Sequence, residues 1–318
     1  MRSTDLDYAL PPELIAQRPA ERRDASRLLV YDRRSGDVRQ RSFAELRDEA
    51  ARYLTVVNDT RVVAARLALR RETGGEVEVL LVERLKGERW EALARPSRRL
   101  RAGEPLLGRD GAAAVELVEP LGAGRWVVRL AGEPDGELPL PPYVHETPAD
   151  PERYQTVYAR DPGSAAAPTA GLHFTPELLA ALDHETVTLH VGLDTFRPLT
   201  TETVEEHEIH GERYRVEEPA WRGIKAAERV LAVGTTTTRV LETLARGGPL
   251  EGRTDLFITP GFAFRRVDAL LTNFHLPRTT LLALVMAFAG VDATRELYAL
   301  AIRERYRFYS FGDAMLVL

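Results

Sequence analysis

Apolar residues along this chain of 318 residues follow two different patterns. Between about Arg61 and Leu130, short runs rich in Val and Leu recur, and Gly-containing turns such as Thr73–Gly75 separate them. Several strands at regular spacing with turns of this kind favour an all-β barrel. The runs that we expect to form strands are Glu76–Glu83, Trp90–Ala94, Ala114–Val118 and Arg125–Leu130.

Outside this segment, strand-like apolar runs alternate with helix-like periods, which predicts an α/β layered domain. We expect strands at 27–31, 54–57, 186–191, 230–233, 256–258, 267–271 and near the end of the chain, and helices at 43–52, 176–182, 236–246, 279–288 and 293–305. The predicted fold class is therefore α/β, a mixed α+β arrangement with an inserted β-barrel. Residues 1–62 and 151–318 would form the main domain and residues 63–150 the barrel, which ends near a linker at Pro139–Pro142.

Composition narrows the class of protein. The chain is 44% hydrophobic and 29% charged, without an apolar run near the roughly 18 residues of a membrane-spanning helix and without a signal peptide at its start. Zero cysteines exclude disulfides and thiolate chemistry and fit a cytoplasmic location, which we expect.

The formal net charge is −5, yet one segment is strongly basic. Arg95, Arg98, Arg99 and Arg101 lie within seven residues without an acid among them, and we expect them to contact RNA phosphates. Only Lys86 and Lys225 are lysines among 43 basic residues, so a general preference for arginine explains most of the arginines, but not this clustering.

A second unusual segment, Gly163–Thr175, consists mainly of small residues and carries no charge. Its composition is typical of a loop that wraps a ligand, with Thr169, Gly171 and His173 as candidate ligand contacts. A tightly packed structural turn is the alternative. Thr175 followed by Pro176 predicts the start of a helix.

Polar residues also follow three predicted strands, at the end where ligands gather in α/β sheets. Asn58–Arg61 follows the first, with Asp59 and Arg61 as candidates and a capping turn as the alternative. Val233–Arg239 joins a strand to a helix start at which Thr235 and Thr236 would favour an anion, with simple helix capping as the alternative.

The third group, Asp268–Pro277, places Asn273 and His275 two residues apart, on one face if the strand continues. Asn273 offers a donor and an acceptor to a base edge, and His275 can move protons near neutral pH. A core histidine bonded to backbone is the alternative. Glu206–Glu212 contains two His residues three apart, but Gly211 breaks a helix there, so we expect no metal site.

Many of these segments resemble one family. The chain from Tyr154 through Thr175 is similar to the signature of S-adenosylmethionine:tRNA ribosyltransferase-isomerases, which act in queuosine biosynthesis. Further similar blocks are Leu10–Gln17, Arg23–Val30, Val57–Val62, Thr73–Leu81, Ala94–Ser97, Leu189–Gly192, Val233–Thr236, Leu271–Pro277, Arg305–Phe308 and Gly312–Met315. Asp194 and Ile209 depart from the family's common residues.

The resemblance implies an enzyme that transfers and isomerises the ribose of S-adenosylmethionine onto 7-aminomethyl-7-deazaguanine in tRNA. The products would be epoxyqueuosine-tRNA, adenine and methionine. S-adenosylmethionine is then a consumed co-substrate, and neither a cofactor, a metal nor a membrane is needed. We expect a monomer.

Candidate roles follow from matching motif positions and chemical suitability. His173 and His275 would transfer protons, and Asp59 and Asp268 would orient them or hold the substrate amine. Arg61, Thr235 and Thr236 would hold the methionine carboxylate, and Asn273 would read a base.

Two other classes of function stay open on sequence alone. One is an S-adenosylmethionine methyltransferase, although the chain has no Gly-x-Gly-x-x-Gly after an early strand. The other is a non-catalytic RNA-binding module that uses the arginine cluster.

Overall fold

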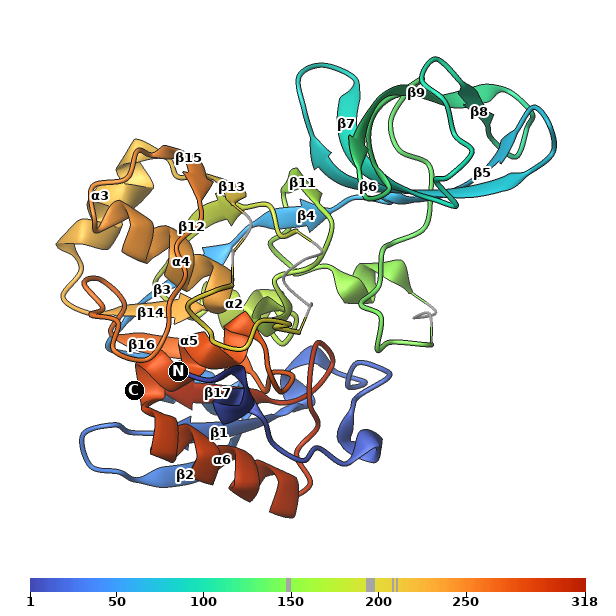
Figure 1. The fold of residues 1–318 in the computed structure, drawn as a ribbon. Helices are drawn as coiled ribbons and strands as arrows, with labels where there is room; N and C mark the ends of the chain where they lie inside the picture. The colour runs from blue at the N-terminus through green and yellow to red at the C-terminus, as the bar shows by residue number, and fades with distance from the viewer. Residues whose placement is uncertain (147–149, 193–197, 208, 210) are drawn as a thin grey trace. The chain divides into compact units, whose positions relative to one another are not determined.

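A computed structural model describes residues 1–146, 150–192, 198–207, 209 and 211–318. The chain divides into two compact units, shown in Figure 1. The main unit contains Met1–Thr60, Pro141–Asp161 and Ala167–Leu318, and the barrel unit contains Arg61–Leu140 and Pro162–Ala166. The chain therefore returns to the main unit at Pro141, before the boundary expected at residue 150.

The elements below are those of the described residues. The strands are β1 (Arg27–Tyr31), β2 (Val38–Ser42), β3 (Leu54–Asn58), β4 (Thr60–Val62), β5 (Arg66–Arg71), β6 (Glu76–Arg84), β7 (Arg89–Arg95), β8 (Pro105–Leu107), β9 (Ala113–Gly122), β10 (Arg125–Leu130), β11 (Asp161–Ser164), β12 (His184–Leu189), β13 (Glu212–Arg215), β14 (Val230–Val233), β15 (Glu251–Thr254), β16 (Ala269–Asn273) and β17 (Ala314–Val317). The helices are α1 (Leu46–Ala50), α2 (Pro176–Ala180), α3 (Glu218–Ala226), α4 (Thr235–Leu244), α5 (Thr280–Ala289) and α6 (Val291–Arg303). Short 3₁₀ helices cover Ser3–Leu6, Pro12–Leu14, Arg23–Ala25, Phe43–Glu45, Pro151–Tyr154 and Thr169–Gly171.

A mixed sheet organises the main unit, with strand order β15-β13-β12-β3-β14-β16-β17-β1-β2. β12, β3, β14 and β16 run parallel, β17 is antiparallel to β16, and β1 is parallel to β17. The central strands β14, β16 and β17 are buried along their whole length, as expected when both faces of a sheet are covered.

One face of this sheet packs beneath α1, α2 and the segment around Phe174. Its core contains alternate residues of the central strands, including Leu28, Leu231 and Leu271. α4 packs against β14, β3 and β12.

The barrel unit is a closed six-stranded antiparallel barrel with the order β10-β7-β6-β5-β8-β9. Its interior holds alternate residues of these strands, among them Val79, Leu81, Trp90 and Trp126. The predicted fold class, an α/β main domain with an inserted β-barrel, is confirmed.

Two predicted elements differ from the structure. The strand expected at 256–258 is wrong: β15 lies at Glu251–Thr254, where backbone bonding to β13 at the sheet edge needs no apolar pattern. The helix expected over 43–52 is split into a 3₁₀ turn and the short α1.

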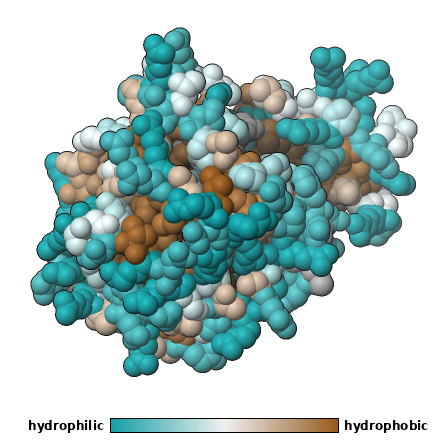
Figure 2. Space-filling view, turned by 90° about the horizontal axis from the view of Figure 1, so that it is seen from below, coloured by the Kyte–Doolittle hydropathy of each residue, from teal (hydrophilic) through white to brown (hydrophobic). Residues whose placement is uncertain are grey.

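Figure 2 shows one face covered mostly by hydrophilic side chains, with smaller apolar areas between them. No described helix is both long enough and apolar enough to span a bilayer.

Candidate functional site

The topology of the main sheet brings distant segments to one edge. Because β3, β14 and β16 are parallel, their carboxyl ends at Asn58, Val233 and Asn273 lie at the same edge. β17 runs the other way, with Ala314 opposite Asn273, so Asp313 lies there too. β1 is parallel to β17 and begins there, next to Ser26.

A chain of hydrogen bonds through His173 crosses this edge. Asn273 Oδ1 accepts from the Thr169 hydroxyl (3.0 Å), while Asn273 Nδ2 donates to the Asp313 carbonyl (3.4 Å) and to His173 Nε2 (3.1 Å). His173 Nε2 is therefore an acceptor, and its Nδ1–H donates to Ser26 Oγ (2.8 Å). This arrangement fixes the tautomer of His173 and uses both donors of the Asn273 amide.

Hydrogen bonds of both the ring and the backbone hold His275 in place. Its ring Nε2 lies 2.7 Å from Thr272 Oγ1. Its N–H donates to the Tyr298 hydroxyl (3.0 Å), and its carbonyl accepts from the Tyr8 hydroxyl. Tyr8, Tyr298 and Phe274 belong to one cluster of aromatic rings, so His275 stands on a rigid support.

Burial keeps both histidines uncharged. It lowers the pKa of the His275 imidazole from 6.5 to about 3. Burial also lowers the pKa of His173 to about 3, and the positive charges of Arg307 and Arg23 act in the same direction. At neutral pH, each ring is therefore a neutral donor and acceptor.

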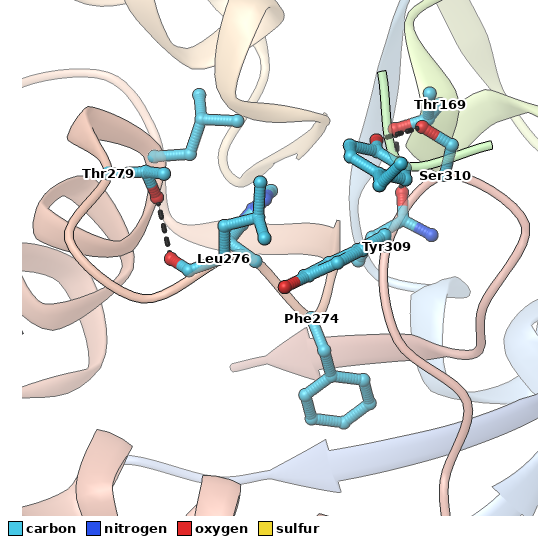
Figure 3. A pocket seen from close by; sticks show the side chains of 10 residues that line it. Thr169, Phe274, Leu276, Thr279, Tyr309 and Ser310 are labelled. Carbon is cyan, nitrogen blue, oxygen red and sulfur yellow. Dashed lines mark hydrogen bonds between the residues drawn. The ribbon is translucent and has the colours of Figure 1, made fainter. Parts of the chain in front are cut away.

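A pocket that is partly open to solvent lies beside His275 in the main unit, and the empty space in it and at its mouth, open solvent included, is about 320 Å³. Its lining consists of Tyr143, Thr169, Asn273, Phe274, His275, Leu276, Thr279, Leu281, Tyr309 and Ser310. Figure 3 shows Tyr309 crossing this region while the Phe274 ring turns away from it. β16 ends at Asn273, so the extended geometry expected through His275 does not continue, yet both residues line the pocket.

The threonines at the start of α4 have different partners. Thr237 and Thr238 donate to the carbonyls of Val233 and Gly234 (2.7 and 3.1 Å). Thr236 Oγ1 lies 3.3 Å from Asn58 Nδ2. Thr235 and Thr236 thus stay at the sheet edge, while the next two threonines are used within the helix.

The predicted acidic residues do not contact the histidines. Asp59 is buried, and its carboxylate accepts from Thr188 Oγ1 (2.6 Å) and Arg160 Nη2 (2.7 Å). Asp268 precedes β16 at the opposite end from Asn273, and its carboxylate caps the Val230 N–H (2.9 Å). The expected orienting role of Asp268 is therefore incompatible with its place in the sheet. The structure gives His173 and His275 neutral partners instead.

Gly171 is required by close packing. A Cβ at this position would lie 1.9 Å from the Tyr158 hydroxyl and 2.9 Å from Thr156 Cγ2. Only glycine lets the loop that carries Thr169 and His173 approach this tyrosine.

The remaining predicted residues lie elsewhere. Arg61 is on β4, where the chain enters the barrel unit. Glu208 and His210 of the segment tested for metal binding, and Asp194, lie outside the described residues. Within the described part of the chain, no group of three or more His, Asp or Glu side chains is arranged to hold a metal ion.

The arginine cluster is exposed on the barrel unit. The Arg71–Glu104 ion pair (2.5 Å) supports it: Arg71 donates to the Arg99 carbonyl, and Glu104 accepts from the Arg101 N–H. No carboxylate among the described residues forms an ion pair with Arg95, Arg98, Arg99 or Arg101. These four guanidinium groups are therefore available to an anionic partner.

Sequence reasoning missed several residues of the site. Ser26 and Thr272 were not singled out, although each is in a block that carries the family resemblance. Tyr309 and Ser310 lie in the gap between two such blocks, and Tyr143 follows a proline-rich segment that was assigned to a linker. Because Tyr309 lies between the similar blocks Arg305–Phe308 and Gly312–Met315, the family resemblance could have pointed to it.

Comparisons with known proteins cover the whole chain. Residues 3–317 match the family model described as Queuosine biosynthesis protein. The S-adenosylmethionine:tRNA ribosyltransferase-isomerase of Rubrobacter xylanophilus is 55% identical, with 100% of this chain and 98% of that protein covered. The protein of the same name from Symbiobacterium thermophilum is 50% identical, with both chains covered completely.

A crystal structure is also similar. S-adenosylmethionine tRNA ribosyltransferase from Thermotoga maritima is 38% identical, with a TM-score of 0.56, and the match covers 99% of this chain and 100% of that one.

Proposed function

The chain belongs to the S-adenosylmethionine:tRNA ribosyltransferase-isomerase family of queuosine biosynthesis, whose members are transferases and isomerases. From this membership, we propose that the protein catalyses the following reaction. It transfers the ribose of S-adenosylmethionine to the aminomethyl group of 7-aminomethyl-7-deazaguanine in tRNA and isomerises it. The products are epoxyqueuosine-tRNA, adenine and methionine. The observation that carries the proposal is 55% identity over the complete chain.

The reaction needs little beyond positioned polar groups. The sulfonium of S-adenosylmethionine acidifies the neighbouring C5′ protons, so removal of one of them drives adenine out. The neutral substrate amine then forms a bond to the opened sugar, and methionine leaves as the epoxide closes. No resident cofactor takes part in this scheme, and a dry site strengthens its electrostatics.

We assign the proton transfer to His275. Its ring lines the pocket, is rigidly supported through the bond to the Tyr298 hydroxyl, and is uncharged at physiological pH. His173 acts as a positioning residue, because its two ring nitrogens are committed to Ser26 and Asn273.

The methionine carboxylate would lie at the first turn of α4, beside Thr235 and Thr236. A helix start favours an anion through its N–H groups and its dipole. Gly234, in a left-handed conformation (φ 89°), sets the turn that brings this helix start to the sheet edge.

We expect the protein to release adenine from S-adenosylmethionine only when it is given tRNA that carries 7-aminomethyl-7-deazaguanine. Chromatography of the small molecules measures this, with unmodified tRNA, which carries guanine in place of the deazaguanine, as the matched control. S-adenosylhomocysteine as product, with a methyl group on the RNA, would instead identify a methyltransferase. Bound tRNA without affinity for S-adenosylmethionine would identify a binding module.

Replacing Arg98, Arg99 and Arg101 together by Gln should weaken tRNA binding and flatten its dependence on salt. Each lost phosphate contact lowers the slope of log K against log[salt] by roughly 0.7–0.9, so three contacts lower it by about 2–3. Binding titrations at several salt concentrations measure the slope.

The matched control is a triple Gln variant of Arg70, Arg84 and Arg109, which are exposed arginines of the same barrel that already pair with Glu76, Glu133 and Glu137. An equal change in both triple variants would show that only the general charge of the barrel matters.

A further inference from the structure

Tyr309 has an unusual backbone conformation at the pocket. Its φ is 71°, in the left-handed region that bulky residues rarely occupy and that costs free energy to maintain. The Tyr309 N–H donates to the Phe274 carbonyl (3.0 Å), and its carbonyl accepts from Gly312 (2.9 Å). A Cβ at Gly312 would lie 2.4 Å from the Arg307 carbonyl oxygen, so the turn depends on this glycine. The surrounding structure therefore forces Tyr309 into this conformation.

The Tyr309 side chain is buried, and it lines the pocket. Tyr143 packs against the Tyr309 ring (centroids 4.6 Å apart) and is itself bonded to Ser310 Oγ at 2.6 Å. The Tyr309 hydroxyl points toward Leu276, as Figure 3 shows, and has no hydrogen-bond partner among the described residues. The ring is thus fixed in place while its polar end remains available to a ligand.

The chemistry of the lining limits what can occupy the pocket. Of the ten described residues that line it, none is Asp, Glu, Lys or Arg. A ligand group that is charged would be buried without a counter-ion, which is costly. Apolar and aromatic surface with a few hydroxyl groups suits a neutral planar ring.

We propose that this pocket binds the adenine of S-adenosylmethionine, with Tyr309 as its aromatic platform and specificity-determining residue. The inference rests on the proposed function, because it selects among the parts of that reaction's substrates. The α-amino and α-carboxyl groups of the methionine part are charged, and the aminomethyl group of the deazaguanine is a cation in water. Adenine is the ring system that brings no charge.

The hydrogen-bonding pattern of the site agrees with this choice. Asn273 has both amide donors in use, so the expected reading of a base edge by Asn273 does not apply, and Tyr309 recognises adenine by stacking against its face. With adenine in the pocket, the ribose lies at its wall, where His275 is placed.

The test is direct binding of adenine, 5′-methylthioadenosine and methionine to the purified protein by calorimetry, without tRNA. Tyr309→Leu, which removes the ring, should weaken the two adenine-containing ligands by roughly 10- to 100-fold. Tyr309→Phe keeps the ring and should retain most of the affinity.

A second variant avoids the loss of packing. Leu281 is only partly buried, so Leu281→Trp should fold normally while it fills the pocket, and it should block adenine binding. Leu121→Trp, at an exposed position of the barrel, is the matched control and should bind like the wild type.

The outcomes separate the two proposals. Wild-type affinity for adenine in both Tyr309→Leu and Leu281→Trp would overturn the adenine pocket, even if the wild type consumes S-adenosylmethionine with tRNA. Loss of methionine binding alone in these variants would assign the pocket to the other end of the substrate. If adenine binds as expected but no turnover occurs with any tRNA, the proposed reaction fails and the adenine pocket stands.

Discussion

Replacing His275 by Gln should slow adenine release by roughly 10²–10⁴-fold and leave the affinity for S-adenosylmethionine near its wild-type value. A positioned group that transfers a proton contributes a factor of this size to turnover. Gln can retain a hydrogen bond to Thr272, where His275 Nε2 now lies 2.7 Å from the hydroxyl, but it cannot accept a proton at neutral pH. Single-turnover adenine release and calorimetric binding measure the two quantities separately.

His173→Gln should show the opposite division, with weaker binding and a smaller effect on the chemical step. His173 holds Asn273, which in turn holds Thr169 at the pocket, so its loss disturbs the positions of groups that contact the ligand. His184→Gln is the control, because His184 is exposed on β12. Near wild-type turnover in His275→Gln would make His275 a structural histidine of the aromatic cluster.

The low pKa of His275 adds a second signature. Because this ring is already neutral well below pH 6, it should contribute no ionisation near pH 6.5 to the rate of adenine release. Around that pH, the wild type and His275→Gln should therefore show pH profiles of the same shape. A pH profile of single-turnover rates for both proteins provides the comparison.

The architecture could be predicted because its signals are local. Apolar residues alternate with polar ones in barrel strands such as β6 and β10. The central strands β14 and β16 are mainly continuous apolar runs. Elements with weaker apolar patterns were missed. β2 is mostly exposed, and β13 and β15, of four residues each, pair with each other at the edge of the sheet.

The site was predictable in its segments but not in its pairings. Polar groups were predicted after β3, β14 and β16, and the parallel pairing of these strands brings their carboxyl ends to one edge. The bond between His173 and Asn273 joins residues 100 positions apart, and nothing local specifies it. Acidic partners for the histidines were expected from chemistry, whereas Ser26 and Thr272 supply neutral hydroxyl groups.

The Tyr309 turn shows a further limit of sequence reasoning. Aromatic residues carry no preference for left-handed backbone, so the conformation depends on Gly312 and on bonds to Phe274 across the fold. Local rules fail at such positions because the tertiary structure imposes the strain.

The two buried histidines should make stability fall as the pH is lowered from about 6.5. The pKa of each in the folded protein is about 3, below the value of 6.5 without burial, so the unfolded chain binds more protons between these limits. Stability is therefore fully present above pH 6.5 and decreases by about 1.4 kcal/mol per pH unit for each histidine below it. The range from pH 6.5 to 5 is the most informative, because most carboxylates remain ionised there.

His173→Gln should remove one histidine's share of this slope, even though its stability at pH 7 also falls through the lost bonds to Ser26 and Asn273. The free energy of unfolding is measured by urea titration at each pH. Pulsed hydrogen exchange of peptides from β14 and β16 reports the unfolding of the main unit separately from that of the barrel. His184→Gln, which replaces an exposed histidine, should keep the wild-type slope. An unchanged slope in His173→Gln would mean that His173 is accessible enough to protonate in the folded protein, and its fixed neutral tautomer would have to be abandoned.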